Sequence, residues 1–342
     1  MKKQYKRILI CFGTRPEVIK VAPIIKVLEE KKIKYTSVFT GQHSDLFDDV
    51  SDLIPKPDYK LSIMKTNQSL SDILISISNK FVKILKEVMP DIVIVQGDTS
   101  TVLTCSLNAF YENIAVGHVE AGLRSYNLKS PFPEEGNRQL VSRIASFNWA
   151  PTEEAVKNLK SEGVSNICLT GNTIVDSCSN FNFSIKYSNK ILITIHRREN
   201  FGEKIIKIFN ELNNLAQKYK DIEFIFPMHP NPNVQKHKHL LSNVNVIEPL
   251  SYINLIKLLS EVKFVISDSG GIQEECASFK KKILVCRDNT ERPEGISAGF
   301  AKIIGTEVEK NFDWANQNYR WNGQNPYGDG NAAKKIIKSL GY

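Results

Sequence analysis

Residues 7–17 read RILICFGTRPE, and the two elements they contain are the starting point for the whole fold. The first part, Arg7–Phe12, is an apolar, β-branched run of strand length. Thr14 and Glu17 stand three residues apart, as in a helix capping box, and Pro16 suits a first helical turn. An apolar strand that passes directly into a helix is typical of a parallel sheet with helices on both faces.

The same alternation continues along the chain, so an α/β fold is predicted. Five further runs have the composition of buried strands: Asp91–Gln96, Ile191–Ile195, Ile222–Phe226, Lys263–Ser267 and Lys282–Cys286. Two weaker candidates are Tyr35–Thr40 and Ile114–Val119. Helical patterns fill much of the space between them, at Val18–Lys31, Leu70–Val88, Ile205–Lys218 and Tyr252–Leu259.

The length of 342 residues predicts two domains, at about 150 residues each. Each half carries its own series of strands and helices. The helical pattern Glu153–Gly163 ends one series and Ile191 begins the next, so a boundary is expected near residues 165–175. Gly330–Leu340 predicts one more helix at the end of the chain.

The charge balance favours an anionic ligand. The chain has 45 Lys and Arg against 37 Asp and Glu, a net charge of +8, and its pI is near 9.0. The basic clusters Lys2-Lys3 and Lys280-Lys281-Lys282 are short and isolated. They are interpreted as solvated surface, and nucleic acid is not expected as a partner.

The cysteines and the apolar runs point to the cytoplasm. Six cysteines are scattered without a C-x-x-C pair, which predicts buried free thiols in a reducing compartment. The apolar run after the basic N-terminus is too short for a signal peptide. No stretch approaches the about 20 apolar residues that cross a bilayer, so no membrane association is expected.

Unusual polar groups follow nearly every predicted strand. Ligands of open parallel sheets bind outside the carboxyl ends of the strands. Six such endings together predict a cleft between two domains, with active-site groups on both walls. The endings are Gly13–Glu17, Gly97–Ser100, Gly117–Gly122, His196–Asn200, His229–Pro232 and Asp268–Gly271.

Two of these endings suit phosphate. The helix expected after Thr14 offers free N–H groups, and Arg15 and Lys20 add positive charge. The alternative there is a capped surface helix with solvated bases. Ser269-Gly270-Gly271 lets the backbone approach a diphosphate closely, or forms a simple turn. Glu275, one turn on, could accept hydrogen bonds from a ribose or lie exposed on its helix.

Common cofactor and metal motifs are absent. The chain has neither the G-x-G-x-x-G fingerprint nor the P-loop, which argues against bound NAD and against ATP hydrolysis. It has no H-E-x-x-H, and His237 and His239 lie in a polar stretch that is read as surface. No cofactor and no metal are therefore expected.

Three carboxylates stand in apolar or glycine-rich surroundings: Asp98, Glu120 and Glu134. Carboxylates that share a cleft can hold different pKa values and divide acid and base roles between them. The structural alternatives are an ion pair of Glu120 with Arg124, and an ordinary acid at a helix start for Glu134.

These motifs resemble the non-hydrolysing UDP-N-acetylglucosamine 2-epimerases. The matching segments occur in the family's order from residue 12 to residue 330. They include FGTRPEVIK (12–20), TGQH (40–43), VQGDT (95–99), GHVEAGLRS (117–125), PFPEE (131–135), HRREN (196–200), HPNP (229–232), DSGGIQEE (268–275), RDNTERPE (287–294) and NPYGDG (325–330).

The resemblance implies a glycosyltransferase-B-like architecture of two Rossmann-like domains facing a cleft. The expected N-terminal domain holds the catalytic carboxylates and spans residues 1–168 and 331–342, with the last helix crossing back to it; the UDP-binding domain spans 169–330. The resemblance also implies a homodimer without a redox cofactor. The implied substrate is a UDP-sugar, inverted at C2 by elimination of UDP to 2-acetamidoglucal and re-addition.

The resemblance further assigns roles to the residues. Asp98, Glu120 and Glu134 would carry the acid–base work, with Arg138 orienting the acidic cluster. His196, Arg15, Lys20 and Ser269–Gly271 would stabilise the departing diphosphate. Glu275 would hold the ribose, and the remaining expected contacts are Gln42, His43, His229, Arg287 and Arg292.

The sequence departs from the family in the region where many bacterial members bind a second substrate molecule as an activator. Asp45 and Asn67 stand where those members often have another polar residue and an arginine, which leaves activation open. The 2-epimerases of UDP-2,3-diacetamido-glucuronic acid, a glycosyltransferase of the same architecture, a hydrolysing relative and a silent nucleotide-sugar sensor also remain as alternatives.

Overall fold

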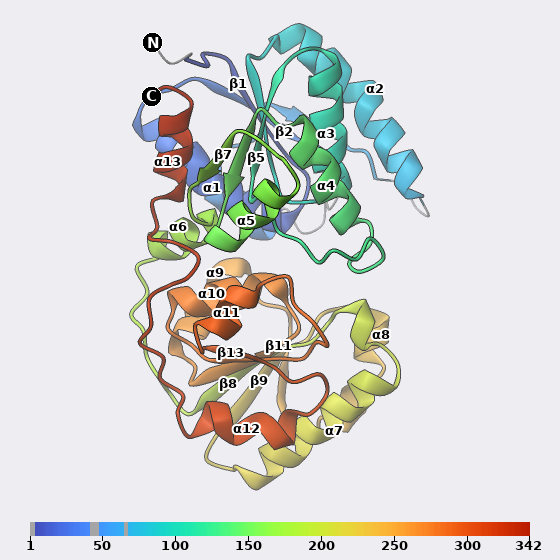
Figure 1. Cartoon of the computed structure of the whole chain (residues 1–342). Coiled ribbons are helices and arrows are strands. Elements are labelled where there is room, and N and C mark those ends of the chain that lie inside the picture. The colour runs from blue at the N-terminus through green and yellow to red at the C-terminus, as the bar shows by residue number, and fades with distance from the viewer. Residues whose placement is uncertain (1–3, 42–47, 65–67) are drawn as a thin grey trace. The chain divides into compact units, whose positions relative to one another are not determined.

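The computed structural model describes residues 4–41, 48–64 and 68–342. The chain divides into two compact units (Figure 1). Unit 1 comprises Met1–Ser177 and Tyr327–Tyr342, and unit 2 comprises Cys178–Pro326. The sequence predicts domain boundaries at 168/169 and 330/331, whereas the two units meet at 177/178 and 326/327 along the chain.

Unit 1 is built on a seven-stranded sheet in the order β3-β2-β1-β4-β5-β6-β7. Every neighbouring pair is parallel, and β1 lies between β2 and β4. All five residues of β1 and of β4 are buried, as strands with helices on both faces require. The strands are β1 (Ile8–Phe12), β2 (Tyr35–Phe39), β3 (Tyr59–Lys60), β4 (Ile92–Gln96), β5 (Ala115–Val119), β6 (Phe147–Ala150) and β7 (Ile167–Leu169).

The helices of unit 1 pack on this sheet with their apolar stripes inward. In α2, Ile73, Ile77, Phe81 and Ile84 recur at helical spacing and join one core with the apolar residues of β1 and β4. The helices are α1 (Arg15–Glu30), α2 (Leu70–Val88), α3 (Ser100–Tyr111), α4 (Glu134–Ile144), α5 (Glu153–Ser161), α6 (Thr173–Asn180) and α13 (Ala332–Ser339), with a 3₁₀ turn η1 (Asp48–Leu53). The described helices include none with the combination of length and hydropathy that a bilayer-spanning segment needs.

Unit 2 repeats the plan with six parallel strands in the order β10-β9-β8-β11-β12-β13. The strands are β8 (Lys190–Thr194), β9 (Glu223–Pro227), β10 (Asn245–Ile247), β11 (Phe264–Ser267), β12 (Ile283–Val285) and β13 (Ala301–Ile303). The helices are α7 (Glu203–Lys218), α8 (Pro232–Gln235), α9 (Tyr252–Glu261), α10 (Gly270–Ser278), α11 (Pro293–Ser297) and α12 (Val308–Asn316), with 3₁₀ turns η2 (Arg198–Asn200) and η3 (Lys238–Leu240).

The final helix returns to unit 1, and this expectation is confirmed. Figure 1 shows α13, at the end of the chain, beside α1, near its start. Asp176 receives the incoming helix: its carboxylate accepts the N–H of Ala332 at 3.2 Å and that of Ala333 at 3.0 Å. Asn331, at the N-cap position, makes no side-chain cap. The carboxylate of Asp176, which lies on α6, caps α13 in its place.

All eight predicted strands and the predicted helices occur, with ends shifted by a few residues. The interpretation of Lys280–Lys282 as solvated surface is wrong. Lys281 is fully buried and Lys282 nearly so. Each of the three ammonium groups lies over an aromatic ring, at 5.0 Å from the Trp321 centroid for Lys280, 3.9 Å from Tyr187 for Lys281 and 4.2 Å from Trp314 for Lys282. Burial lowers the pKa of Lys281 to about 8.

Replacing Asp176 by Ala should weaken the docking of α13. Loss of a helix cap costs about 0.5–2 kcal/mol, and this carboxylate is buried, so we expect the upper part of that range in urea unfolding. Hydrogen exchange at the amides of residues 332 and 333 should accelerate. Lys335→Ala, which removes an exposed ion pair between α13 and Asp329 just before it, should cost less than about 0.5 kcal/mol. Equal losses in the two variants would contradict the capping role.

Candidate active site

The order of the strands reverses between β1 and β4 in unit 1 and between β8 and β11 in unit 2. At such a point the connections after adjacent strands leave toward opposite faces of the sheet, so their loops separate and open a crevice at the carboxyl ends. The loops concerned carry Gly13–Glu17 and Gly97–Thr99 in unit 1. In unit 2 they carry His196 and Asp268–Gly271. Most of the predicted site residues therefore lie at the two switch points or just after the strands beside them, as Glu120 does after β5 and His229 after β9.

Glu120 follows β5 and is held from three directions. Its carboxylate accepts hydrogen bonds from Lys20, from Gln96 and from Asn172. Its φ of +67° lies in the left-handed region that non-glycine residues rarely adopt, which is a form of strain that clusters at functional sites. The alternative partner Arg124 pairs instead with Glu162, at 2.7 Å, so the proposed pair of Glu120 and Arg124 is wrong.

Lys20 is buried, and its ammonium group forms an ion pair with Glu120. The sequence pattern predicts that Lys20 contacts phosphate beside Arg15. In unit 1 its charge is directed at Glu120, a predicted catalytic carboxylate. Arg15 is the first residue of α1 and is half-buried.

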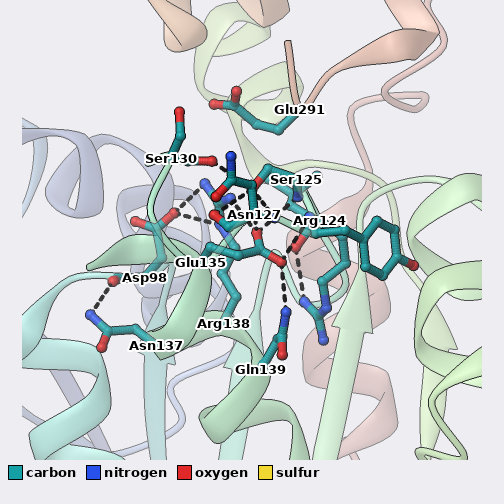
Figure 2. Close-up of polar contacts among 12 residues, drawn as sticks. Asp98, Arg124, Ser125, Asn127, Ser130, Glu135, Asn137, Arg138, Gln139 and Glu291 are labelled. Carbon is teal, nitrogen blue, oxygen red and sulfur yellow. Dashed lines mark hydrogen bonds and ion pairs between the residues drawn. The ribbon is translucent and has the colours of Figure 1, made fainter. Parts of the chain in front are cut away.

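Asp98 follows β4 and is oriented by Arg138, as the sequence analysis expected. Figure 2 shows the guanidinium between Asp98 and Glu135. Nε and Nη2 of Arg138 lie 2.8 and 2.7 Å from the same oxygen, Oδ2 of Asp98. Asn137 donates to the main-chain carbonyl of Asp98 at 2.7 Å. One quarter of the Asp98 side chain stays exposed, so the carboxylate is fixed and still accessible.

Glu135 is the residue of this cluster that the sequence did not single out. It is fully buried and gathers the loop that precedes α4, accepting from the N–H of Ser125 at 2.8 Å and of Tyr126 at 3.2 Å (Figure 2). Burial alone would raise the pKa of its carboxyl. Hydrogen bonds from Ser125 and Gln139 and the charge of Arg138 outweigh burial and hold that pKa below its usual value. Glu135 is therefore a fixed anion that supports Arg138.

Glu134, the neighbouring acid, begins α4 and differs from an ordinary solvated acid at a helix start. Its Oε2 atom is buried and has no hydrogen-bond partner among the described residues. A buried carboxylate oxygen without a partner is rare in native structures and is typical of a functional position.

Glu17 does not form the capping box that the sequence predicted. Thr14 makes no side-chain cap, and the Glu17 carboxylate reaches one residue further back, to the N–H of Gly13 at 2.6 Å. Its other oxygen accepts from the Thr99 hydroxyl at 2.6 Å. Burial raises the pKa of Glu17 to about 7, against the lowering effect of its hydrogen bonds.

His118 supports the loop that carries Asp98. It is fully buried on β5, and its Nε2 lies 2.7 Å from the carbonyl oxygen of Gly97, the residue before Asp98. Burial lowers the pKa of the imidazole to about 4, so the ring is neutral at pH 7 and Nε2 carries the proton it donates.

In unit 2, Asp268 organises the loop that carries His196. The buried Asp268 carboxylate accepts from the N–H of His196 at 3.0 Å, from the N–H of Arg197 at 2.8 Å and from Asn200 at 2.9 Å. The His196 ring stacks on that of His229, with centroids 5.3 Å apart. The two predicted histidines are therefore neighbours, and Asp268, which had no assigned role, sets the course of the backbone between β8 and η2.

The Ser269–Gly271 segment leads into α10, as predicted. A Cβ on Gly270 would lie 2.6 Å from Nη1 of Arg292, so glycine is needed there for the guanidinium to pack on the backbone. A Cβ on Gly271 would meet nothing within 4 Å. Glu275 is buried one turn on and accepts from the Tyr252 hydroxyl at 2.9 Å, so the alternative of an exposed helix residue is wrong.

The two predicted cleft arginines are both neutralised within unit 2. Arg292 pairs with Glu274 at 2.7 Å and with Glu291, and Arg287 pairs with Glu291 at 3.0 Å and Glu199 at 2.6 Å. Their charges thus support the local fold. Gln42 and His43 lie outside the described residues. Within the described residues, no three His, Cys, Asp or Glu side chains gather as a metal site would require.

Exchanging Glu17 for Gln should change how stability depends on pH. Below pH 4.5, the ordinary pKa, the carboxyl is protonated in both states and its contribution is fully present. Between pH 4.5 and about 7 only the unfolded chain ionises, so the free energy of unfolding falls as pH rises. The wild type should lose about 3 kcal/mol across this window relative to Glu17→Gln, measured by urea unfolding. Parallel curves for the two proteins would contradict the raised pKa.

Comparison with known proteins agrees with this geometry. A family model described as UDP-N-acetylglucosamine 2-epimerase matches residues 26–341. The UDP-N-acetylglucosamine 2-epimerase of Neisseria meningitidis is 43% identical, over 98% of this chain and 99% of that protein. The protein of the same name from Bacillus subtilis is 42% identical, over 98% and 94%.

Solved structures give the same result. The crystal structure of the Neisseria meningitidis UDP-GlcNAc 2-epimerase bound to UDP-GlcNAc matches with a TM-score of 0.90 at 41% identity, covering 98% of this chain and 99% of that chain. The Staphylococcus aureus MnaA–UDP co-structure has a TM-score of 0.88 at 41% identity, covering 97% and 95%. Acinetobacter baumannii MurG, at 14% identity and a TM-score of 0.61, shares the fold alone.

The two Rossmann-like units, the carboxylates at the strand ends and the match over nearly the whole length lead to one conclusion: the chain belongs to the UDP-N-acetylglucosamine 2-epimerase family, and it is a carbohydrate epimerase.

Proposed function

We propose that the protein interconverts UDP-N-acetylglucosamine and UDP-N-acetylmannosamine without hydrolysing them, by eliminating UDP and adding it back. The observation that carries this proposal is the set of three carboxylates in unit 1, one oriented by an arginine, one paired with a lysine and one with an unpartnered buried oxygen. The relative whose structure contains UDP-GlcNAc supports the choice of substrate.

Carboxylates that move protons cannot carry out this reaction alone, because the diphosphate must also depart. The proton on C2 of the sugar is weakly acidic, so it can leave only while the C1–O bond breaks. A base takes the C2 proton, the C1–C2 double bond of 2-acetamidoglucal forms, and UDP departs with the electron pair of the C1–O bond. The reverse steps, with a proton delivered to the other face of C2 and UDP returned to C1, give the epimer.

In this proposal, carboxylates of unit 1 carry out the proton transfers. Asp98 suits this work because Arg138 fixes the direction of its carboxylate while a quarter of the side chain stays accessible. Glu120 and Glu134 are the partners on which the second transfer would depend. Lys20, paired with Glu120, would fix the position of that carboxylate.

In this proposal, unit 2 binds UDP, the leaving group. The free N–H groups at the start of α10 would bind the diphosphate, since a helix N-terminus stabilises negative charge. His196, fixed through its backbone by Asp268 and stacked on His229, would meet the charge that develops on the departing oxygen. Glu275 would accept hydrogen bonds from the ribose, with Tyr252 holding its carboxylate.

Arg292 takes a different role in this proposal from the one the sequence suggested. Because two glutamates already neutralise it, it would act by packing on Gly270 and holding the start of α10, and not as a free anion contact.

We also propose that the enzyme is a cytoplasmic homodimer. Six unpaired cysteines, five of them buried, suit a reducing compartment. Exposed apolar side chains on neighbouring helices of unit 1, Ile75 on α2, Phe110 on α3 and Leu140 on α4, are candidates for a subunit interface. Light scattering on the purified protein tests the oligomeric state.

Incubation with UDP-N-acetylglucosamine in D2O tests the proposed reaction. Mass spectrometry and NMR should show deuterium at C2 and the accumulation of the manno epimer. The same assay with UDP-2,3-diacetamido-glucuronic acid separates the two substrate classes. Free N-acetylmannosamine with stoichiometric UDP would show a hydrolase, and absence of exchange with every UDP-sugar tested would refute the proposal.

Asp98→Asn should abolish turnover while UDP still binds. The amide keeps the size of the side chain but cannot take a proton, so kcat should fall by about 10² or more. UDP affinity, measured by calorimetry, should change little, because the proposed diphosphate contacts lie in unit 2. Asp91→Asn, at the other end of β4, is the matched control and should keep full kcat. An active Asp98→Asn protein would remove Asp98 from the mechanism.

Gly271→Ala should weaken UDP binding without lowering stability. A methyl group at residue 271 meets no protein atom within 4 Å, so the fold has no need for glycine there. In the proposal the diphosphate fills this space, and the UDP dissociation constant should rise by about 10-fold or more. The melting temperature should stay within about 2 °C of the wild type or rise. Unchanged UDP affinity would show that the diphosphate binds elsewhere.

A further inference from the structure

Glu17 joins the loop after β1 to the loop after β4. One carboxylate oxygen accepts the N–H of Gly13 and the other accepts the Thr99 hydroxyl, each at 2.6 Å. The residue is 2% exposed, so both hydrogen bonds are shielded from water and from competition by it. Glu17 thus bridges the switch point of unit 1, where the two loops would otherwise diverge.

The Thr99 end of this bridge bears on Asp98. Thr99 is the next residue along the chain and is the N-cap of α3, where its hydroxyl accepts from the N–H of Val102. Asp98 is already held at its main-chain carbonyl by Asn137 and at its carboxylate by Arg138. The hydrogen bond from Thr99 to Glu17 adds a constraint on the residue that follows Asp98 and ties it to the loop after β1.

We propose that Glu17 is a positioning residue of the epimerase reaction, which acts through the Thr99 hydroxyl and the Gly13 N–H to fix the backbone that carries Asp98. This inference rests on the proposed function of Asp98. At 2% exposure, Glu17 has almost no surface with which to contact a substrate. Its effect is geometric, and a displacement of about 1 Å at a reacting group is enough to cost up to about 10² in rate.

The chain offers a matched control at the opposite end of the same two strands. Asp91 precedes β4, and its carboxylate accepts the N–H groups of Lys6 and Arg7, each at 3.0 Å, just before β1 begins. Glu17 and Asp91 therefore make the same kind of bridge between β1 and β4. Only the Glu17 bridge lies at the carboxyl ends, beside Asp98. If both bridges served only the fold, removing either should leave kcat unchanged, whereas a positioning role predicts a loss of kcat for Glu17 alone.

Steady-state kinetics of Glu17→Ala, Glu17→Gln and Asp91→Ala test the inference, with folding checked by circular dichroism. Glu17→Ala should lower kcat by about 10-fold or more, with KM and the UDP dissociation constant within about 3-fold of the wild type. Glu17→Gln should recover kcat to within about 3-fold, because its oxygen can accept from Gly13 and its amide can donate to Thr99. Asp91→Ala should leave kcat unchanged. A Glu17→Gln protein as slow as Glu17→Ala, or an equal loss in Asp91→Ala, would overturn the inference.

Thr99 supplies a second, independent test. Thr99→Val removes the hydroxyl and should lower kcat as Glu17→Ala does, whereas Thr99→Ser should retain it. If Glu17 acts through Thr99, the double variant Glu17→Ala/Thr99→Val should be no slower than the slower single variant. Multiplied losses would show two separate effects and contradict the route through Thr99. An inactive wild type would refute the proposed function, whereas an active wild type with an active Glu17→Ala variant would refute only this inference.

Discussion

Two parallel strands that send their chains to opposite faces of a sheet leave their carboxyl-terminal loops apart, and the positions of Asp98 and His196 depend on how this gap is bridged. In unit 1 the buried Glu17 bridges the loops after β1 and β4. In unit 2 the buried Asp268, after β11, accepts two main-chain N–H groups of the loop after β8. A carboxylate is suited to this task because its two oxygens accept several hydrogen bonds and so satisfy backbone donors that no strand partner reaches.

These bridges fix the backbone beside two reacting groups of the proposed mechanism. Asp98 lies next to the Thr99 end of the first bridge, and His196 supplies one of the N–H groups of the second. The charges around them are arranged in pairs: Arg138 with Asp98 and Lys20 with Glu120 in unit 1, Arg292 with Glu274 in unit 2. Among the predicted carboxylates Glu134 stands apart, because its buried Oε2 has no partner among the described residues. In the proposed mechanism this oxygen would be available to a bound substrate.

Much of this could be predicted from the sequence, for identifiable reasons. Buried parallel strands such as β1 and β4 are continuously apolar, and the rule that ligands bind at their carboxyl ends located Asp98, Glu120, His196 and Ser269–Gly271. The strands β3, β7, β10 and β13 have only two or three residues each and are mostly partly exposed, so they lack an apolar run, whereas the equally short β12 is fully buried and lies in one. The roles of Glu17, Glu135 and Asp268 could not be predicted because each depends on partners elsewhere in the chain; Thr99 is 82 residues from Glu17. Lys280–Lys282 were misjudged for the same reason, since their aromatic partners come from Tyr187, Trp314 and Trp321.

The central claim is that the C2 proton leaves only as the bond between C1 and the diphosphate breaks. UDP-N-acetylglucosamine labelled with ¹⁸O in the oxygen that bridges C1 and the β-phosphate tests it most directly. If UDP departs and returns, the label should become distributed over the non-bridging β-phosphate oxygens of recovered substrate and product, which ³¹P NMR detects. Inversion at C2 with the label still wholly in the bridging position would contradict the account.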